Sequence, residues 1–91
     1  MFLSQTLAAL SDPNRQKIID ALKKKDMSVT EINSFVSVTM PTLSHHLDTL
    51  KRADLVTSRR QGQNIIYSLN LSVIDDVTEA ILKLLSKGGS K

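Results

Sequence analysis

The 91-residue sequence has no cysteine and no tryptophan, and it has only three glycines and two prolines. Without cysteine, the chain cannot form a disulfide framework, a cysteine-based zinc or iron–sulfur site, a thiolate nucleophile or a thiol redox sensor. With so few aromatic residues, leucine, isoleucine and valine must build most of the core, which favours helices over a β-sandwich. No apolar run approaches the roughly 18 residues of a membrane-spanning helix, and the first residues lack the features of a signal peptide. We therefore expect a cytoplasmic protein that does not span a membrane.

A chain of this length predicts one domain, over residues 1–86, followed by a flexible tail over residues 87–91. A domain so small covers its apolar surface poorly, which favours pairing with a second copy. The net charge is +3, and the charges are unevenly distributed. Four cations lie within one ten-residue stretch: Lys51, Arg52, Arg59 and Arg60. This cluster suits a polyanion such as nucleic acid, although an ordinary solvated charge run has the same composition.

Apolar spacing and capping signals predict five helices and one β-hairpin. Three helices begin at capping signals: Ser11 or Asp12 before Pro13, a capping box from Ser28 to Glu31, and Thr39 before Pro41. The predicted helices span residues 2–10, 13–25, 29–36, 40–52 and 72–85, and the predicted strands span 55–60 and 64–69. The brief turn between the third and fourth helices predicts a helix-turn-helix. The expected fold is mainly helical with a small β-hairpin wing, which is the winged helix-turn-helix architecture.

The fourth helix and the hairpin are the expected functional elements. If Leu43, Leu47 and Leu50 face the core, a step of about 100° per residue exposes a row of hydroxyl, imidazole and guanidinium groups on the opposite face. Such groups can hydrogen-bond base edges and phosphates in a major groove of DNA. The candidate DNA-contacting residues of the helix are Thr39, Met40, Thr42, Ser44, His45, His46, Thr49, Lys51 and Arg52. Those of the wing are Arg59, Arg60, Gln61, Gly62 and Gln63.

Several of these residues have a structural reading beside the functional one. His46 lies nearer the core edge, where it either contacts DNA or bonds a backbone group that fixes the helix. Met40 either reaches a base methyl group or covers the turn. Arg59 and Arg60 either bind DNA at the wing or serve as edge-strand charges that oppose aggregation.

The last predicted helix carries apolar residues over an arc too broad for one small core to cover. A helix of this kind needs a second surface against it, which we interpret as a partner chain. The predicted homodimer interface consists of Phe2, Leu3, Leu7, Val77, Ile81, Leu84 and Leu85.

Three stretches of the sequence resemble the signature segments of the ArsR family of transcriptional repressors. They are residues 9–15 (ALSDPNR), residues 41–47 (PTLSHHL) with Leu50, and residues 60–63 (RQGQ) followed by 66–69 (IYSL). The resemblance spans nearly the whole chain and implies a cytoplasmic homodimer whose fourth helix reads an inverted repeat in promoter DNA. It also implies a structural or phosphate-facing role for Arg15, to which a salt bridge with Asp12 or another acid is the alternative. The wing is most similar to those of SdpR-type autorepressors, which implies autoregulation and release by a sequestering protein. Release by an unrecognised ligand is the alternative.

The sequence departs from the metal-sensing members of that family. Residues 27–31, which match the stretch where cysteine ligands usually lie, contain none, and the acidic residues Asp75, Asp76 and Glu79 have no histidine beside them. The adjacent His45 and His46 point about 100° apart on a helix, so they cannot chelate one ion within one chain. We expect no cofactor and no transition-metal or thiol sensing site. The acidic cluster is either a solvated face or a site for a hard cation.

Two other classes of function compete with DNA binding. The chain has no nucleophile paired with a base and no glycine-rich phosphate loop, so we do not expect an enzyme. The alternative is a winged-helix interaction module whose last helix or wing binds a partner protein. The arginine and histidine content of the fourth helix and wing favours DNA.

Overall fold

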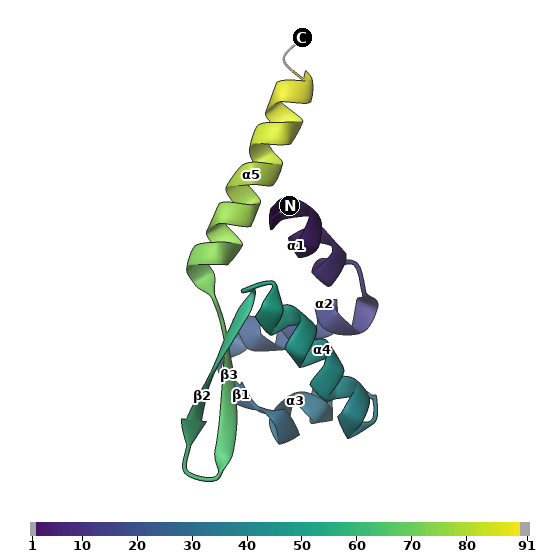
Figure 1. The fold of residues 1–91 in the computed structure, drawn as a ribbon, viewed down its shortest axis with the longest axis vertical. Helices are drawn as coiled ribbons and strands as arrows, with labels where there is room; N and C mark the ends of the chain where they lie inside the picture. The colour runs from purple at the N-terminus through teal and green to yellow at the C-terminus, as the bar shows by residue number, and fades with distance from the viewer. Residues whose placement is uncertain (1, 90–91) are drawn as a thin grey trace.

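The computed structural model in Figure 1 describes the backbone of residues 2–89 and the side chains of residues 4–86. Its elements, in chain order, are α1 (Phe2–Leu10), α2 (Pro13–Lys24), β1 (Met27–Ser28), α3 (Val29–Phe35), α4 (Met40–Arg52), β2 (Val56–Gln61), β3 (Asn64–Leu69) and α5 (Leu71–Gly89). The strands form one antiparallel sheet in the order β1–β3–β2. The predicted mainly helical fold with a hairpin wing is confirmed.

The three helix starts predicted from capping signals are built as the sequence indicates. The carboxylate of Asp12 accepts hydrogen bonds from two backbone N–H groups of α2, at 2.8 and 3.2 Å. Ser28 and Glu31 form the reciprocal capping box, with distances of 3.2 and 2.9 Å. Thr39 is the N-cap of α4. These caps satisfy backbone donors that a helix leaves unpaired in its first turn, so local sequence fixes where α2, α3 and α4 begin.

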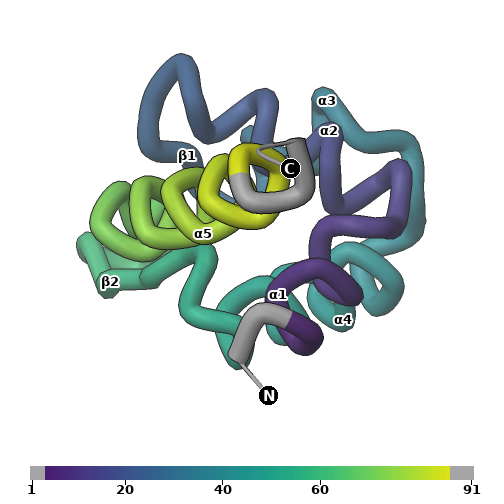
Figure 2. The backbone as a smooth tube through the Cα atoms, turned by 90° about the horizontal axis from the view of Figure 1, so that it is seen from above, coloured from purple at the N-terminus to yellow at the C-terminus, as the bar shows by residue number. Residues whose placement is uncertain are grey.

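The core lies between α2, α3, α4 and the base of the sheet. Its largest fully buried side chains are Ile18, Met27, Ile32, Val36, Leu43, Leu47, Leu50, Leu55 and Val56. The helical ones come from the apolar stripes that defined the helices in the sequence, and Met27, Leu55 and Val56 come from the strands and the connection before β2. α1 contacts α2 and α4 on the outside of this core (Figure 2).

The structure corrects the sequence prediction at two places. The sheet has a third strand, β1, in which Met27 pairs with Tyr67 and Ser28 with Ile66. Two residues are too few to show an alternating pattern, and this strand forms only because β3 presents a free edge to it. At the other end, α5 continues to Gly89, so residues 87–89 are helical where a tail was expected from residue 87. Residues 90 and 91 lie outside the described part of the chain.

The molecule is elongated, with extents of 53 × 23 × 23 Å. Figure 1 shows the reason: α5 leaves the sheet, passes α1 and extends beyond the rest of the chain. The wing projects from the opposite end of the long axis. The elongated shape thus leaves the second half of α5 with little of its own chain to pack against.

Candidate nucleic-acid interface

α4 presents a polar face to solvent because its apolar face is fixed in the core. Leu43, Leu47 and Leu50 are all 1% exposed or less, which sets the rotation of the helix about its axis. The predicted residues of α4 that are exposed are Thr39, Met40, Thr42, Ser44, His45, Lys51 and Arg52. This row combines hydroxyl groups, an imidazole and two cations along one side of a single helix.

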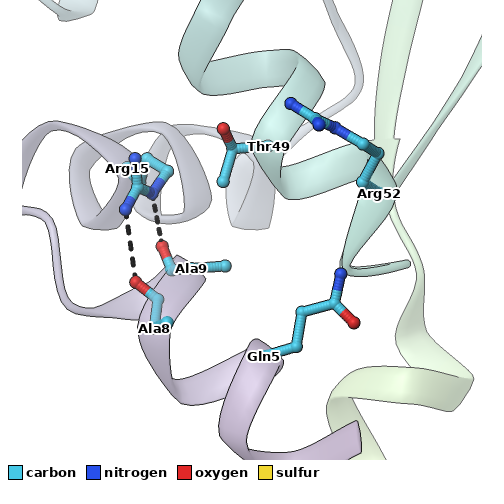
Figure 3. Close-up of a pocket in the computed structure, with 6 residues that line it drawn as sticks. All are labelled: Gln5, Ala8, Ala9, Arg15, Thr49 and Arg52. Atoms are coloured by element: carbon cyan, nitrogen blue, oxygen red, sulfur yellow. Dashed lines mark hydrogen bonds between the residues drawn. The ribbon is translucent and has the colours of Figure 1, made fainter. Parts of the chain in front are cut away.

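The hydroxyl groups of α4 differ in their availability. The Thr39 and Thr42 hydroxyls lie 3.0 Å apart at the exposed start of the helix. Thr49, by contrast, is half-buried and donates to the backbone carbonyl of His45 at 3.0 Å. Together with Gln5 and Arg52, it lines a hollow near α1 whose volume is about 240 Å³ (Figure 3). Thr49 is therefore the least accessible of the predicted hydroxyl contacts.

The cations at the end of α4 are exposed and weakly held. Arg52 forms an ion pair with Asp48 at 3.0 Å, and both side chains are more than 60% exposed. An exposed pair of this kind contributes less than about 1 kcal/mol, so Arg52 can exchange Asp48 for a phosphate at little cost. Lys51 forms no ion pair within the described residues. Both cations remain available to a polyanion.

His46 does not belong to the exposed face. Its residue exposure is 7%, and its Nδ1 lies 3.2 Å from a terminal nitrogen of Arg15 while its Nε2 lies 3.9 Å from a carboxylate oxygen of Asp12. The prediction that placed His46 among the DNA contacts is therefore corrected, because its ring faces into the fold. Of its two readings, the structural one applies, with Arg15 of α2 and the N-cap Asp12 beside the ring instead of a backbone group.

Arg15 also has a structural place. Its guanidinium donates to the backbone carbonyls of Ala9 at 2.6 Å and Ala8 at 3.2 Å, in the last turn of α1 (Figure 3). It thereby supplies donors to two carbonyl groups in the last turn of α1, where the Ala8 carbonyl also accepts from Ser11. No ion pair joins Arg15 to Asp12 within the described residues.

The wing is a regular hairpin in which Arg59 pairs with Ile66, Arg60 with Ile65 and Gln61 with Asn64. Gly62 has φ of +65° in its turn, a conformation that glycine adopts without strain. All five predicted wing residues are exposed: Arg59, Arg60, Gln61, Gly62 and Gln63. The tip thus carries cationic and amide donors with no carboxylate among them.

The two wing arginines differ. One terminal nitrogen of Arg59 lies 3.1 Å from both the Asp26 carboxylate and the Ser68 hydroxyl, whereas Arg60 has no ion pair within the described residues. The hydrogen bonds from Ser68 and Arg59 lower the pKa of Asp26. Arg59 therefore ties the wing to the α2–β1 connection, and Arg60 is the freer cation. Nothing in the sequence signalled this link, because Asp26 and Arg59 are 33 residues apart.

Comparison with known proteins places this geometry in a family. A helix-turn-helix domain model matches residues 10–59. The transcriptional repressor SdpR of Bacillus subtilis is 40% identical over 86 residues, covering 94% of this chain and 96% of that protein. The chain belongs to the ArsR family of transcriptional regulators. The resemblance found in the sequence is thereby confirmed, and the protein is a DNA-binding transcriptional repressor of a non-enzymatic family.

Two solved structures of ArsR-type proteins share the fold. The regulator from Rhodococcus sp. RHA1 superposes with a TM-score of 0.85 at 24% identity, covering 94% of this chain and 81% of that one. The other is the homodimeric winged helix-turn-helix DNA-binding domain of a possible ArsR-family regulator from Mycobacterium bovis. It has a TM-score of 0.74 at 25% identity and covers 94% of this chain and 79% of that one.

In this ArsR-family chain the acidic residues of α5 do not come together as a metal site. Asp75, Asp76 and Glu79 are all exposed, and the described residues contain no group of three or more histidine or acidic side chains placed to hold an ion. The described part of the chain also contains no helix with the length and apolar character needed to cross a membrane.

The predicted dimer residues of this ArsR-family chain fall into three groups. Leu7, Leu84 and Leu85 are exposed, at 44%, 58% and 68%, and Ile81 is partly buried. Val77 is only 4% exposed within its own chain, so it has almost no surface left for a partner and is removed from the prediction. The side chains of Phe2 and Leu3 lie outside the described residues.

Proposed function

We propose that this ArsR-family repressor binds an inverted-repeat operator as a homodimer and represses its own gene, and that neither a transition metal nor a thiol signal is needed for binding. The observation that carries the proposal is the exposed row of α4, with the cationic wing tip projecting beyond it. α4 supplies side chains that can read base edges, and the wing supplies donors for the flanking backbone.

The roles of individual residues follow from their exposure. Thr42, Ser44 and His45 lie in the first half of α4 and are exposed, so we assign base readout in the major groove to them. Lys51, Arg52 and Arg60 are exposed cations, to which we assign phosphate contacts. Phosphate contacts add affinity on any sequence, whereas base contacts separate one sequence from another. Arg59 contributes mainly by holding the wing in place.

The homodimer is supported by the apolar face of α5. Leu84 follows Val77 by seven residues, or about two helical turns, so both lie on the same face. Yet Val77 is 4% exposed and Leu84 is 58% exposed. The apolar face continues along α5, but the rest of the chain covers it at Val77 and not at Leu84, because α5 extends past the other elements (Figure 1). A second copy supplies an identical apolar face by symmetry, as the homodimeric relative from Mycobacterium bovis illustrates for its own chain.

The proposal is tested by fluorescence anisotropy with a duplex from upstream of the protein's own gene and a scrambled duplex of equal composition. Titrations are run at two salt concentrations, with and without chelator. We expect tight, salt-sensitive binding that favours the upstream duplex and does not change with chelator. Equal weak binding to both duplexes contradicts autoregulation. No binding at low salt contradicts DNA recognition and favours a protein partner for the wing or α5.

Variants separate the two kinds of contact. His45→Ala is expected to reduce the preference for the upstream duplex, because it removes a base-reading group. Arg60→Ala is expected to weaken both duplexes alike and to reduce the salt slope of the dimer by about two, at about 0.9 per lost phosphate contact. Lys83→Ala is the matched control, since it removes one charge from α5, away from α4 and the wing. An Arg60→Ala slope equal to that of Lys83→Ala contradicts the phosphate contact.

A further inference from the structure

Three helices meet at the guanidinium of Arg15. The side chain starts from α2, donates to the Ala8 and Ala9 carbonyls at the end of α1, and reaches Nδ1 of His46 in α4. Figure 3 shows the two bonds to α1. One side chain therefore connects the helix that carries the exposed Leu7 to the helix that carries the DNA-reading face.

The chemistry of this contact fixes the state of His46. A guanidinium has donors and no acceptor, so Nδ1 of His46 must accept and carries no proton. The ring proton is then on Nε2, which lies 3.9 Å from a carboxylate oxygen of Asp12. Asp12 is itself fixed, because it caps α2. The imidazole is thus held at Nδ1 by Arg15 of α2, and the carboxylate of the N-cap Asp12 lies beside its other ring nitrogen.

The Arg15–His46 contact adds a directional bond to α4, whose apolar packing is driven by a force that is not directional. The leucines of α4 bury an apolar stripe, and apolar packing permits small rotations and tilts of a helix. The hydrogen bond at Nδ1 is directional and comes from a charged donor, which makes it stronger than a neutral one. His45 immediately precedes His46 in the chain. A rotation of α4 at His46 therefore turns the base-reading face by the same angle.

We propose that the Arg15–His46 bond is a positioning link that sets the angle of α4 relative to α1 and so determines the half-site spacing that the dimer accepts. The proposal rests on the proposed function, because it requires a dimer on an inverted repeat. One extra base pair moves a half-site by about 3.4 Å and turns it by about 36°. A dimer with fixed recognition helices rejects such a change, whereas one with loosened helices tolerates it.

The test uses the inverted-repeat duplex that the wild-type protein selects from a randomised library, and derivatives with one base pair added to or removed from its centre. We expect wild type to lose about tenfold or more in affinity for the altered spacings, a loss comparable to that of a mismatched base pair. His46→Phe keeps a ring and removes the acceptor, and should reduce this loss to about threefold or less. His46→Asn keeps an acceptor near the Nδ1 position and should restore the wild-type discrimination.

Two further measurements separate positioning from simple loss of fold. Affinity for the scrambled duplex should be unchanged in His46→Phe, and Arg15→Met should relax the spacing preference from the other side of the bond. Wild-type spacing discrimination in folded His46→Phe and Arg15→Met overturns the proposal. The proposal is also overturned if His46→Phe keeps the wild-type discrimination against altered spacings while His46→Asn loses it.

A measurement without DNA distinguishes failure of the link from failure of the proposed function. Long-range ¹H–¹⁵N spectra report which ring nitrogen of His46 carries the proton. We expect the Nε2–H form in the wild-type protein and loss of that preference in Arg15→Met. An Nδ1–H form in the wild-type protein refutes the link. If the library yields no selected duplex, the proposed function fails, and these spectra still decide whether the link exists.

Discussion

Replacing Leu84 by alanine tests the assigned dimer face directly. Leu84 continues the face of α5 on which Val77 is buried, but it is 58% exposed in the single chain. If a second copy covers it, Leu84→Ala should weaken dimer formation and leave the folded monomer unchanged. The expected loss arises from the apolar surface that the partner would cover.

The size of the effect follows from the exposed fraction. Truncation removes three carbons, each worth about 0.8 kcal/mol when buried, or about 2.4 kcal/mol in all. Because 58% of the residue is exposed before pairing, about 1.4 kcal/mol of this belongs to the dimer contact. Symmetry counts it twice, which gives about 2.8 kcal/mol, or roughly a hundredfold rise in the dissociation constant of the dimer.

Sedimentation equilibrium over a range of protein concentrations measures that constant. Leu82→Ala is the matched control: Leu82 is 59% exposed, and it lies two residues from Leu84, roughly 160° around the helix. It should change the dissociation constant much less. Circular dichroism should show the same helix content in both variants. An effect of Leu84→Ala below about threefold, or one equal to that of Leu82→Ala, would refute the assigned face.

Three further predictions concern single residues. Asp54 has a strained φ of +60° at the end of α4, where the N–H groups of Leu55 and Asp54 donate to the carbonyls of Leu50 and Lys51 respectively. Because glycine adopts this φ without strain, Asp54→Gly should raise the free energy of unfolding by about 0.5 kcal/mol in urea titrations, and a loss of stability would contradict this reasoning. Ser28→Ala should lower the free energy of unfolding by about 1 kcal/mol, because it removes a capping bond of α3. Ser37→Ala, in the exposed turn, should not change it measurably, and equal effects of the two substitutions would show that the cap is unimportant. The fold lowers the pKa of Asp26, so wild type should be more stable than Asp26→Asn at about pH 7, and this difference should disappear as the pH falls below 3.8 through the lowered pKa. Urea titrations at about pH 7 and about pH 2.5 measure the difference, and the same value at both would refute the prediction.

Local signals in the sequence were sufficient for most of the fold. The caps at Asp12, Ser28 and Thr39 are bonds between residues two or three apart, so the sequence places both partners together. The leucine spacing of α4 likewise determines which face is buried. These contacts depend on helical geometry alone, and the predictions made from them agree with the structure.

Predictions failed where partners come from distant parts of the chain. His46 sits at the margin of the helical face, and only the position of Arg15 and Asp12, more than 30 residues away, decides that it is buried. Val77 and Leu84 are equivalent by periodicity, yet one is covered and the other is not. Strand β1 needs the free edge of β3, which no local pattern shows.

The sequence by itself thus determined the helices, the wing, the family and the face of α4 that meets solvent, because each depends on short-range periodicity, capping or a recognisable motif. The tertiary structure decided which side chains on those elements are held by others: His46 by Arg15, Arg59 by Asp26, and Val77 by its own chain. The physical reason is that hydrogen bonds and burial depend on distances between elements. A sequence pattern specifies which face of each element is apolar, but it does not specify where the elements lie relative to one another.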